Sequence, residues 1–104
     1  MIKLLKNLLG LRSETEMKNL VKNGAQIIDV RTPIEYQSGH IRDSVNIPLQ
    51  NLKQSLSKIK KDRPIITCCA SGMRSASAKS ILKANGYREV YNGGGWHNLQ
   101  GKIS

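Results

Sequence analysis

Four short segments with strand character, separated by segments with helical character, constrain the fold more than any other feature of the sequence. Two of them are apolar runs that contain Ile, which is typical of buried strands, and the other two are short strand candidates that contain Val. Strands that alternate with helices in this way favour a parallel sheet covered by helices on both faces. We therefore predict an α/β fold with a central parallel sheet, whose strands lie at residues 25–30, 44–47, 64–68 and 88–91.

The segments between these runs carry the start and stop signals of helices. Ser13 and Glu16 form a capping box ahead of apolar residues at helical spacing, and Gly24 follows as a stop signal. Thr32 followed by Pro33 has the pattern of an N-cap and the first residue of a brief helix. Two further helices are predicted, at residues 49–59 from an apolar face and at residues 75–84.

The length of 104 residues supports one small domain with one modest core. We assign residues 13–104 to this domain and residues 1–12 to an amphipathic N-terminal segment. That segment has Lys3 and Lys6 between its leucines and lacks the small-x-small cleavage pattern of a signal peptide. Its leucines predict a helix docked on the domain, and the alternative is a weak contact with a membrane surface. No apolar run approaches the roughly 18 residues of a membrane span, so a cytoplasmic protein is expected.

The formal net charge of +10 makes a polyanion such as nucleic acid one possible partner. The basic residues are scattered, however, with one modest cluster within residues 58–63, and aromatic residues make up 4% of the chain. Surfaces that bind single-stranded nucleic acid place aromatic side chains among the basic ones, for stacking on the bases. The pattern favours a solvated basic surface, and no nucleic-acid partner is expected.

The two cysteines, Cys68 and Cys69, are adjacent. Adjacent cysteines do not close a disulfide loop, and no second pair exists that would form a disulfide framework or a metal site. If the strand at 64–68 continues, the two side chains point to opposite faces of the sheet. Cys68 is then a buried core residue, whereas Cys69 lies at the carboxyl end of a strand, where parallel α/β sheets bind ligands.

The residues after Cys69 suit a reactive thiolate. The N–H groups of a short loop and of a helix N-terminus carry partial positive charge and stabilise an anion. Gly72 permits a tight turn, and Ala70 and Ser71 are small enough to let an anionic substrate approach. Arg74 adds a guanidinium that can pair with an oxyanion. We predict that Cys69 is a nucleophile whose thiolate form is stabilised at neutral pH.

Three motifs, found in the same order over residues 13–100, together resemble the signatures of rhodanese domains. They are the active-site loop at Cys69–Ser75, the upstream signature at Asp29–Ile41 with Asn46–Pro48, and the C-terminal glycine and tryptophan signature at Gly94–Trp96. The resemblance implies the rhodanese-like α/β fold and the activity of a single-domain thiosulfate sulfurtransferase.

This resemblance also implies how the chemistry is divided among the residues. Cys69 would take sulfane sulfur from a donor such as thiosulfate and hold it as a persulfide. The sulfur would then pass to a thiophilic acceptor, which is cyanide in the assay and a small thiol or a protein in the cell. No metal and no organic cofactor are implied. The implied substrate-binding residues are Ala70, Ser71, Gly72, Met73, Arg74 and Ser75.

The length of the loop and one departure from the family pattern help to weigh sulfur transfer from thiosulfate against other functions. Ala70 stands where many members carry a basic or polar residue, which weakens the expected binding of a doubly charged donor. Four residues separate Cys69 from Arg74, whereas related phosphatases and arsenate reductases have five, so phosphoryl transfer is a disfavoured alternative. A non-catalytic rhodanese-homology binding or regulatory module is another, against which an intact Cys69 and Arg74 argue. A third is a sulfur carrier that docks an acidic protein on its basic surface.

Several other polar residues look like an acid–base set, namely Asp29, Arg31, Glu35 and His40. Persulfide formation needs an activated thiolate more than a general base, so we expect them to brace the fold instead. Arg31 lies close to the carboxyl end of its strand, which would place it at the border of the pocket. His97 is expected to be an ordinary surface residue.

Overall fold

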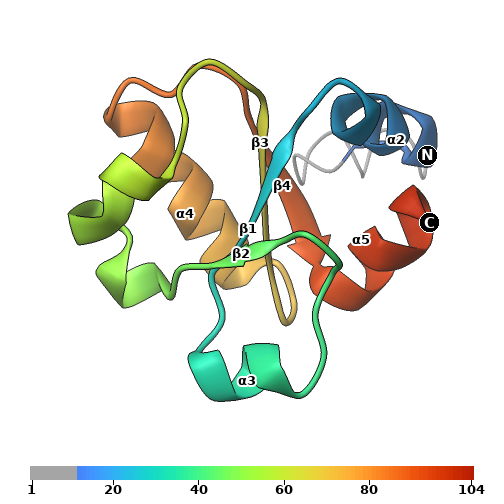
Figure 1. Ribbon diagram of the computed structural model, residues 1–104, viewed down its shortest axis with the longest axis horizontal. Helices are drawn as coiled ribbons and strands as arrows, with labels where there is room; N and C mark the ends of the chain where they lie inside the picture. The colour runs from blue at the N-terminus through green and yellow to red at the C-terminus, as the bar shows by residue number, and fades with distance from the viewer. Residues whose placement is uncertain (1–11) are drawn as a thin grey trace.

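The computed structural model describes residues 12–104 (Figure 1). Apart from residue 12, the N-terminal segment at 1–12 lies outside the described residues, so its docked helix and its membrane-surface contact stay predictions. Within residues 12–104, no helix has both the length and the apolar character that crossing a bilayer requires.

A four-stranded parallel sheet forms the centre of the molecule, as predicted. Its spatial order is β2-β1-β3-β4, and every neighbouring pair is parallel. The carboxyl ends of the strands meet at one edge of the sheet, beside α3 (Figure 1). The strands are β1 (Gln26–Asp29), β2 (Val45–Asn46), β3 (Ile65–Cys69) and β4 (Val90–Gly95).

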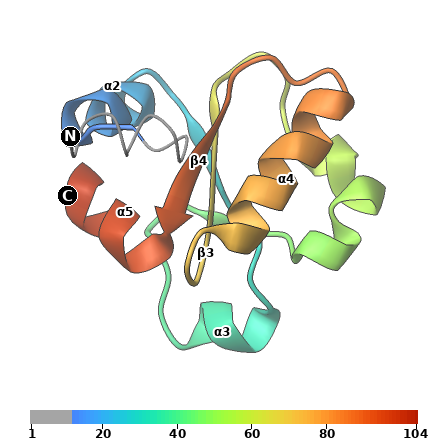
Figure 2. The same ribbon diagram turned by 180° about the vertical axis from the view of Figure 1, so that it is seen from behind.

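Helical segments cover both faces of this sheet (Figures 1 and 2). One face carries α2 (Glu14–Lys22) and α5 (Trp96–Ile103), and the other carries α4 (Met73–Ala84) with the 3-10 segments η1 (Leu49–Asn51) and η2 (Lys53–Lys58). The short helix α3 (Pro33–Gln37) lies beyond the carboxyl ends of the strands. The predicted α/β fold with helices on both faces is confirmed.

The sheet therefore separates two apolar clusters. The cluster under α4 contains Cys69, whereas the cluster under α2 and α5 contains Cys68, Met17 and Leu99. All four of these side chains are fully buried. Burying one Leu, Ile, Val or Met side chain stabilises the folded state by about 1.5–3 kcal/mol, so both clusters contribute substantially to the stability of the fold.

Both predicted N-caps are present, but the predicted capping box at Ser13 is only half formed. The Ser13 side chain accepts a hydrogen bond from the backbone N–H of Glu16 at the start of α2. At α3, Thr32 and Glu35 form a complete capping box, with Pro33 as the first helical residue. This second box matters for the site because it fixes the carboxylate of Glu35 next to the sheet edge.

The predicted helix at 49–59 was wrong in type. Leu52 and Ile59 of its apolar face are buried and the other two leucines are half-buried, but the segment consists of two 3-10 turns with a non-helical residue at Ser55. One physical reason is the hydroxyl of Tyr87, which donates to the carbonyl oxygens of Leu56 and Ile59 at 2.9 Å each. Those carbonyls are satisfied by a side chain from elsewhere in the fold, so the segment does not need α-helical bonds there.

The C-terminal third also differs from expectation. The last strand was predicted at 88–91, but β4 continues through the glycines, and α5 was not predicted. At Gly93 a Cβ atom would lie 2.7 Å from the carbonyl oxygen of Thr67 and 2.8 Å from Leu99. Glycine is thus what lets β4 run close to β3 and α5. Helix α4 begins at Met73, two residues before the predicted start, because Gly72 serves as its N-cap with φ of 106°.

Candidate active site

Cys69 is the last residue of β3 and is fully buried. Its Sγ atom accepts hydrogen bonds from two backbone N–H groups, that of Gly72 at 2.9 Å and that of Ser75 at 3.4 Å. Both donors belong to the loop and the first turn of α4, where N–H groups lack helical partners. The dipole of α4 adds partial positive charge at the same end. This arrangement stabilises a negatively charged sulfur.

The loop after Cys69 rests on the glycines at the end of β4. A Cβ atom at Gly95 would lie 2.8 Å from the carbonyl oxygen of Ala70, and one at Gly72 would lie 3.4 Å from Gly94. The left-handed φ of Gly72 turns its N–H toward the sulfur. The C-terminal glycine motif therefore packs against the backbone of the active-site loop, and these two motifs form one structural unit.

A buried polar network behind the loop was missed from the sequence. The hydroxyl of Thr67 donates to the carbonyl oxygen of Ser75 at 2.9 Å, and the hydroxyl of Ser75 lies 3.1 Å from the carbonyl oxygen of Thr67. The Ser75 hydroxyl also bonds the side-chain oxygen of Asn92, which accepts the N–H of Gly94 at 2.9 Å. The network joins β3, β4 and α4 directly beneath the Ser75 N–H. The sequence does contain a signal for this network, because Thr67 in β3 and Asn92 in β4 are polar residues inside otherwise largely apolar strands.

Arg74 does not stand free at the rim of the loop. Its guanidinium pairs bidentately with Glu35, with Nη1 to Oε1 at 2.7 Å and Nη2 to Oε2 at 2.9 Å. The hydrogen bond from Arg74 and a further one from the Thr32 backbone lower the pKa of Glu35 to about 2, and the Glu35 bond raises the pKa of Arg74. The pair ties α3 to the start of α4 and offsets the charge of Arg74.

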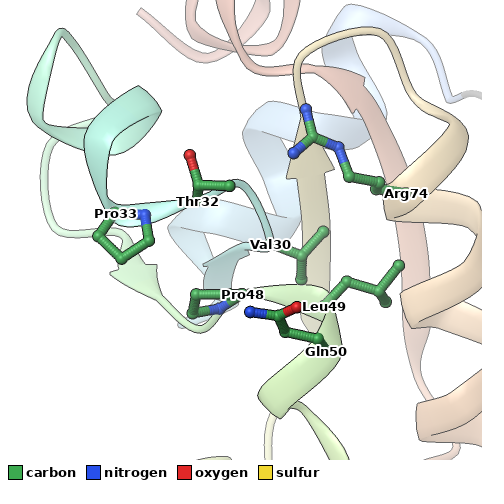
Figure 3. A pocket seen from close by; sticks show the side chains of 7 residues that line it. All are labelled: Val30, Thr32, Pro33, Pro48, Leu49, Gln50 and Arg74. Atoms are coloured by element: carbon green, nitrogen blue, oxygen red, sulfur yellow. The ribbon is translucent and has the colours of Figure 1, made fainter.

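A cavity of about 320 Å³ lies beside this ion pair (Figure 3). Its walls come from the end of β1 with the start of α3, from η1, and from the start of α4, whose Arg74 side chain extends along one side. The cavity opens at the carboxyl ends of the strands, the edge at which the sequence predicted ligand binding. The residues that line it are Val30, Thr32, Pro33, Pro48, Leu49, Gln50 and Arg74.

Arg31 does not border this cavity, contrary to one expectation. It is buried, its Nε and Nη2 atoms donate to the carboxylate of Asp29, and its Nη2 atom also donates to the carbonyl oxygen of Gly39 at 2.7 Å. The guanidinium stacks over the ring of Trp96 at 4.7 Å from the ring centroid. Arg31 and Asp29 thus tie the segment around Gly39 to the sheet, which is the bracing role predicted for this group.

The two histidines are also structural in their contacts. Nδ1 of His40 lies 2.7 Å from the carbonyl oxygen of Tyr36, and the His40 ring stacks on the Tyr36 ring at 3.7 Å. His97 is exposed and meets the Trp96 ring edge-on. Both positions agree with the sequence prediction.

Cys68 faces away from the site. It is packed in the cluster with Met17 and Leu99 on the opposite face of the sheet, as predicted from the strand periodicity. Burial raises the pKa of the Cys68 thiol far above its ordinary value, because desolvation disfavours the thiolate. Of the two thiols, Cys69 alone therefore lies in surroundings that stabilise a charged sulfur.

A family model confirms the resemblance carried by these motifs. The model of the Rhodanese-like domain matches residues 13–102, which is most of the chain. The chain belongs to the rhodanese-like domain family. The loop at Cys69 and the glycines beneath it are thus parts of a rhodanese-like domain.

Curated relatives and solved structures agree with this assignment. YqhL of Bacillus subtilis is 45% identical over 80 residues, which cover 76% of this chain and 64% of YqhL. PspE of Escherichia coli, named a thiosulfate sulfurtransferase, is 39% identical over 74 residues, which cover 69% of this chain and 71% of PspE. A solved rhodanese with anions from E. coli has a TM-score of 0.68 at 35% identity and covers 72% of this chain and 91% of its own. The rhodanese-like domain thus spans less than two thirds of the length of YqhL.

Proposed function

We propose that this chain is a sulfurtransferase that carries sulfane sulfur as a persulfide on Cys69. The observation that carries the proposal is the pair of backbone N–H groups, from Gly72 and Ser75, that donate to the Cys69 Sγ atom. Thiolate and persulfide are both anionic sulfur, so the same donors suit the resting and the loaded state. Membership of the rhodanese-like family and the name of PspE support the assignment.

The proposed reaction has two displacement steps. In the first, the Cys69 thiolate attacks the outer sulfur of a donor such as thiosulfate. A bond forms from Sγ to that sulfur, the S–S bond of thiosulfate breaks, and sulfite leaves with the bonding electron pair. In the second, cyanide or a thiolate attacks the outer sulfur of the persulfide, and the electron pair returns to Sγ. With thiosulfate and cyanide neither step needs a proton transfer, which fits a sulfur whose hydrogen-bond donors are backbone amides.

We assign substrate binding to the loop from Ala70 to Ser75. The loop directs two backbone N–H groups at the Cys69 sulfur, where the transferred sulfur would be bound, and the polar network under Ser75 holds the Ser75 N–H in place. Arg74 borders the neighbouring cavity and positions the loop through Glu35. The acceptor in the cell is a small thiol or a protein thiol. Two free cysteines fit a reducing compartment, so we propose the cytoplasm as the location.

Cyanolysis with thiosulfate tests the proposal, together with mass spectrometry of the protein before cyanide is added. The wild-type protein should gain one sulfur atom and then form thiocyanate, whereas Cys69→Ser should do neither. The matched control is Cys68→Ala, which removes the neighbouring thiol on the other face and should retain both signals.

Two results would contradict the proposal. If a folded wild-type protein takes up no sulfur from thiosulfate or from other sulfane donors, the chain is not a sulfurtransferase. A binding module or an oxyanion substrate would then become the leading explanation of the loop. If Cys69→Ser still turns over, the assignment of Cys69 as the carrier is wrong.

A further inference from the structure

The loop that carries Cys69 has almost no net charge, although the whole chain has a formal charge of +10. The four residues after Cys69 are uncharged, and Arg74 is the next residue. Both terminal nitrogens of Arg74 donate to the carboxylate of Glu35, at 2.7 and 2.9 Å. A guanidinium whose charge is offset by a bound carboxylate attracts a second anion much less than a free one does. The site is therefore poorly equipped to favour a dianion.

The loop itself exposes apolar surface, at Met73. Within residues 12–104, the large apolar side chains that stay exposed are Ile34, at 81%, and Met73, at 80%. Met73 belongs to the loop and lines a second cavity together with Ser71 and Gly72. The exposed side chain of Met73 therefore offers apolar surface to a ligand that binds at the loop.

The cavity beside Arg74 is also lined largely by apolar side chains. Its walls include Val30, Pro33, Pro48 and Leu49, which converge below the guanidinium (Figure 3). Its polar side chains, apart from Arg74, are the uncharged Thr32 and Gln50. An alkyl substituent on a substrate would be removed from water there, which is favourable in proportion to the apolar area buried.

From these observations we infer the class of sulfur donor. The site takes an organic sulfane donor that has an alkyl substituent and at most one negative charge, such as an alkyl persulfide or thiosulfonate, in preference to thiosulfate. This inference rests on the proposed function, because it concerns the donor that loads Cys69.

The loading step with an alkyl persulfide balances without a further reactant. The Cys69 thiolate attacks the outer sulfur of R–S–SH, a bond forms from Sγ to that sulfur, and the S–S bond of the donor breaks. The leaving R–S⁻ takes the bonding electron pair and then the proton of the persulfide. The products are the Cys69 persulfide anion and the thiol R–SH.

Methanethiosulfonate and thiosulfate make a matched pair of probes, because they differ by a methyl group in place of one charged oxygen. The measurement is kcat/KM for each donor in thiocyanate formation, divided by the rate constant of the same donor with free cysteine. This division removes the intrinsic reactivity of each donor. The normalised value should favour methanethiosulfonate by about tenfold or more, as expected for the loss of one like-signed charge at an uncompensated site.

A positive charge placed in the loop should remove most of this preference. Ala70 is exposed and follows Cys69 directly, so Ala70→Lys restores a free cation next to the sulfur. It should raise the ratio of kcat/KM for thiosulfate to kcat/KM for methanethiosulfonate about tenfold. The control is Ala84→Lys, the same exchange at an exposed position at the far end of α4, about 16 Å along the helix from its start.

Each outcome decides between the inference and the function on which it rests. Equal or better normalised use of thiosulfate by the wild-type protein overturns the inference and leaves the sulfurtransferase intact. Failure of both donors to load Cys69 overturns both. An equal gain in Ala84→Lys shows that the overall basic surface sets the preference, which also overturns the inference. The wild-type ratio needs no variant, so it decides even if Ala70→Lys does not fold.

Discussion

Two thiols stand next to each other in this chain and face opposite sides of one strand. Cys68 packs against Met17 and Leu99 in an apolar cluster, whereas Cys69 receives the N–H groups of Gly72 and Ser75. Both are fully buried, so exposure does not distinguish them. What differs is the polarity of the atoms that surround each sulfur. The comparison teaches that a glycine turn and a helix start can place backbone donors around one sulfur while its neighbour in the sequence receives none.

The largest expected effect is on chemical labelling. With iodoacetamide at neutral pH, Cys69 should react at least about 100-fold faster than Cys68, because the thiolate is the nucleophile and burial raises the pKa of Cys68. Peptide mass spectrometry at several reaction times measures the two rates. In urea the two rates should converge. Equal labelling of both cysteines in the folded protein would contradict the claim that only the surroundings of Cys69 stabilise a thiolate.

The next effect concerns the face on which Cys68 lies. Met17→Ala should lower the free energy of unfolding by about 2–5 kcal/mol, because it leaves a cavity in a fully buried cluster. Sulfur transfer at 25 °C should stay within about twofold of the wild type while the protein remains folded, since Met17 lies across the sheet from the loop. Urea unfolding and the cyanolysis assay give the two values. The control Lys18→Ala, on the exposed side of α2, should change neither.

On the other face, Asn92→Ala should reduce the rate of Cys69 alkylation and of sulfur transfer, each by about tenfold. Asn92 accepts from Ser75 and from the N–H of Gly94, so its loss loosens the donors aimed at the sulfur. A shift of the alkylation profile toward higher pH would separate this positioning effect from a loss of stability alone. The control is Asn98→Ala, an exposed asparagine on α5.

The smallest effect is expected for Glu35→Gln. The ion pair with Arg74 is more than a third exposed on each side, so its contribution is about 1 kcal/mol or less. The folded-state pKa of Glu35 lies below its ordinary value of 4.5, at about 2. The stabilisation is therefore complete above pH 4.5 and is lost as the pH falls toward 2. Urea unfolding at pH 6 and at pH 2.5 should show a difference from wild type at the higher pH that shrinks at the lower one.

Much of the fold and of the site follows from local sequence patterns. The Ile- and Val-rich runs located the strands, and the period of two placed Cys68 and Cys69 on opposite faces. The cap at Thr32 and Pro33 located α3. These features are encoded within a few residues, which is why they were visible without any knowledge of tertiary contacts.

The features that were missed depend on contacts between distant segments. Glu35 and Arg74 are 39 residues apart, and nothing local links them. Helix α5 has no side-chain cap and contains Gly101, so its sequence signals helix weakly, and burial of Leu99 is what places it. The 3-10 form of residues 49–58 depends on Tyr87, which reaches across from another part of the fold. Such outcomes need the assembled core before they can be predicted.

The strand that divides the two thiols also decides how a loaded protein can be emptied. A carrier with a second thiol within reach of its persulfide can expel the sulfur by closing a disulfide on itself. Here the other cysteine, Cys68, is packed on the opposite face of the sheet, so it cannot form that disulfide with Cys69. If Cys69 holds sulfur as proposed, the persulfide can be removed only by a separate acceptor molecule. The concentration of that acceptor then sets the lifetime of the persulfide form. The domain would then store sulfane sulfur for a limited time as well as transfer it.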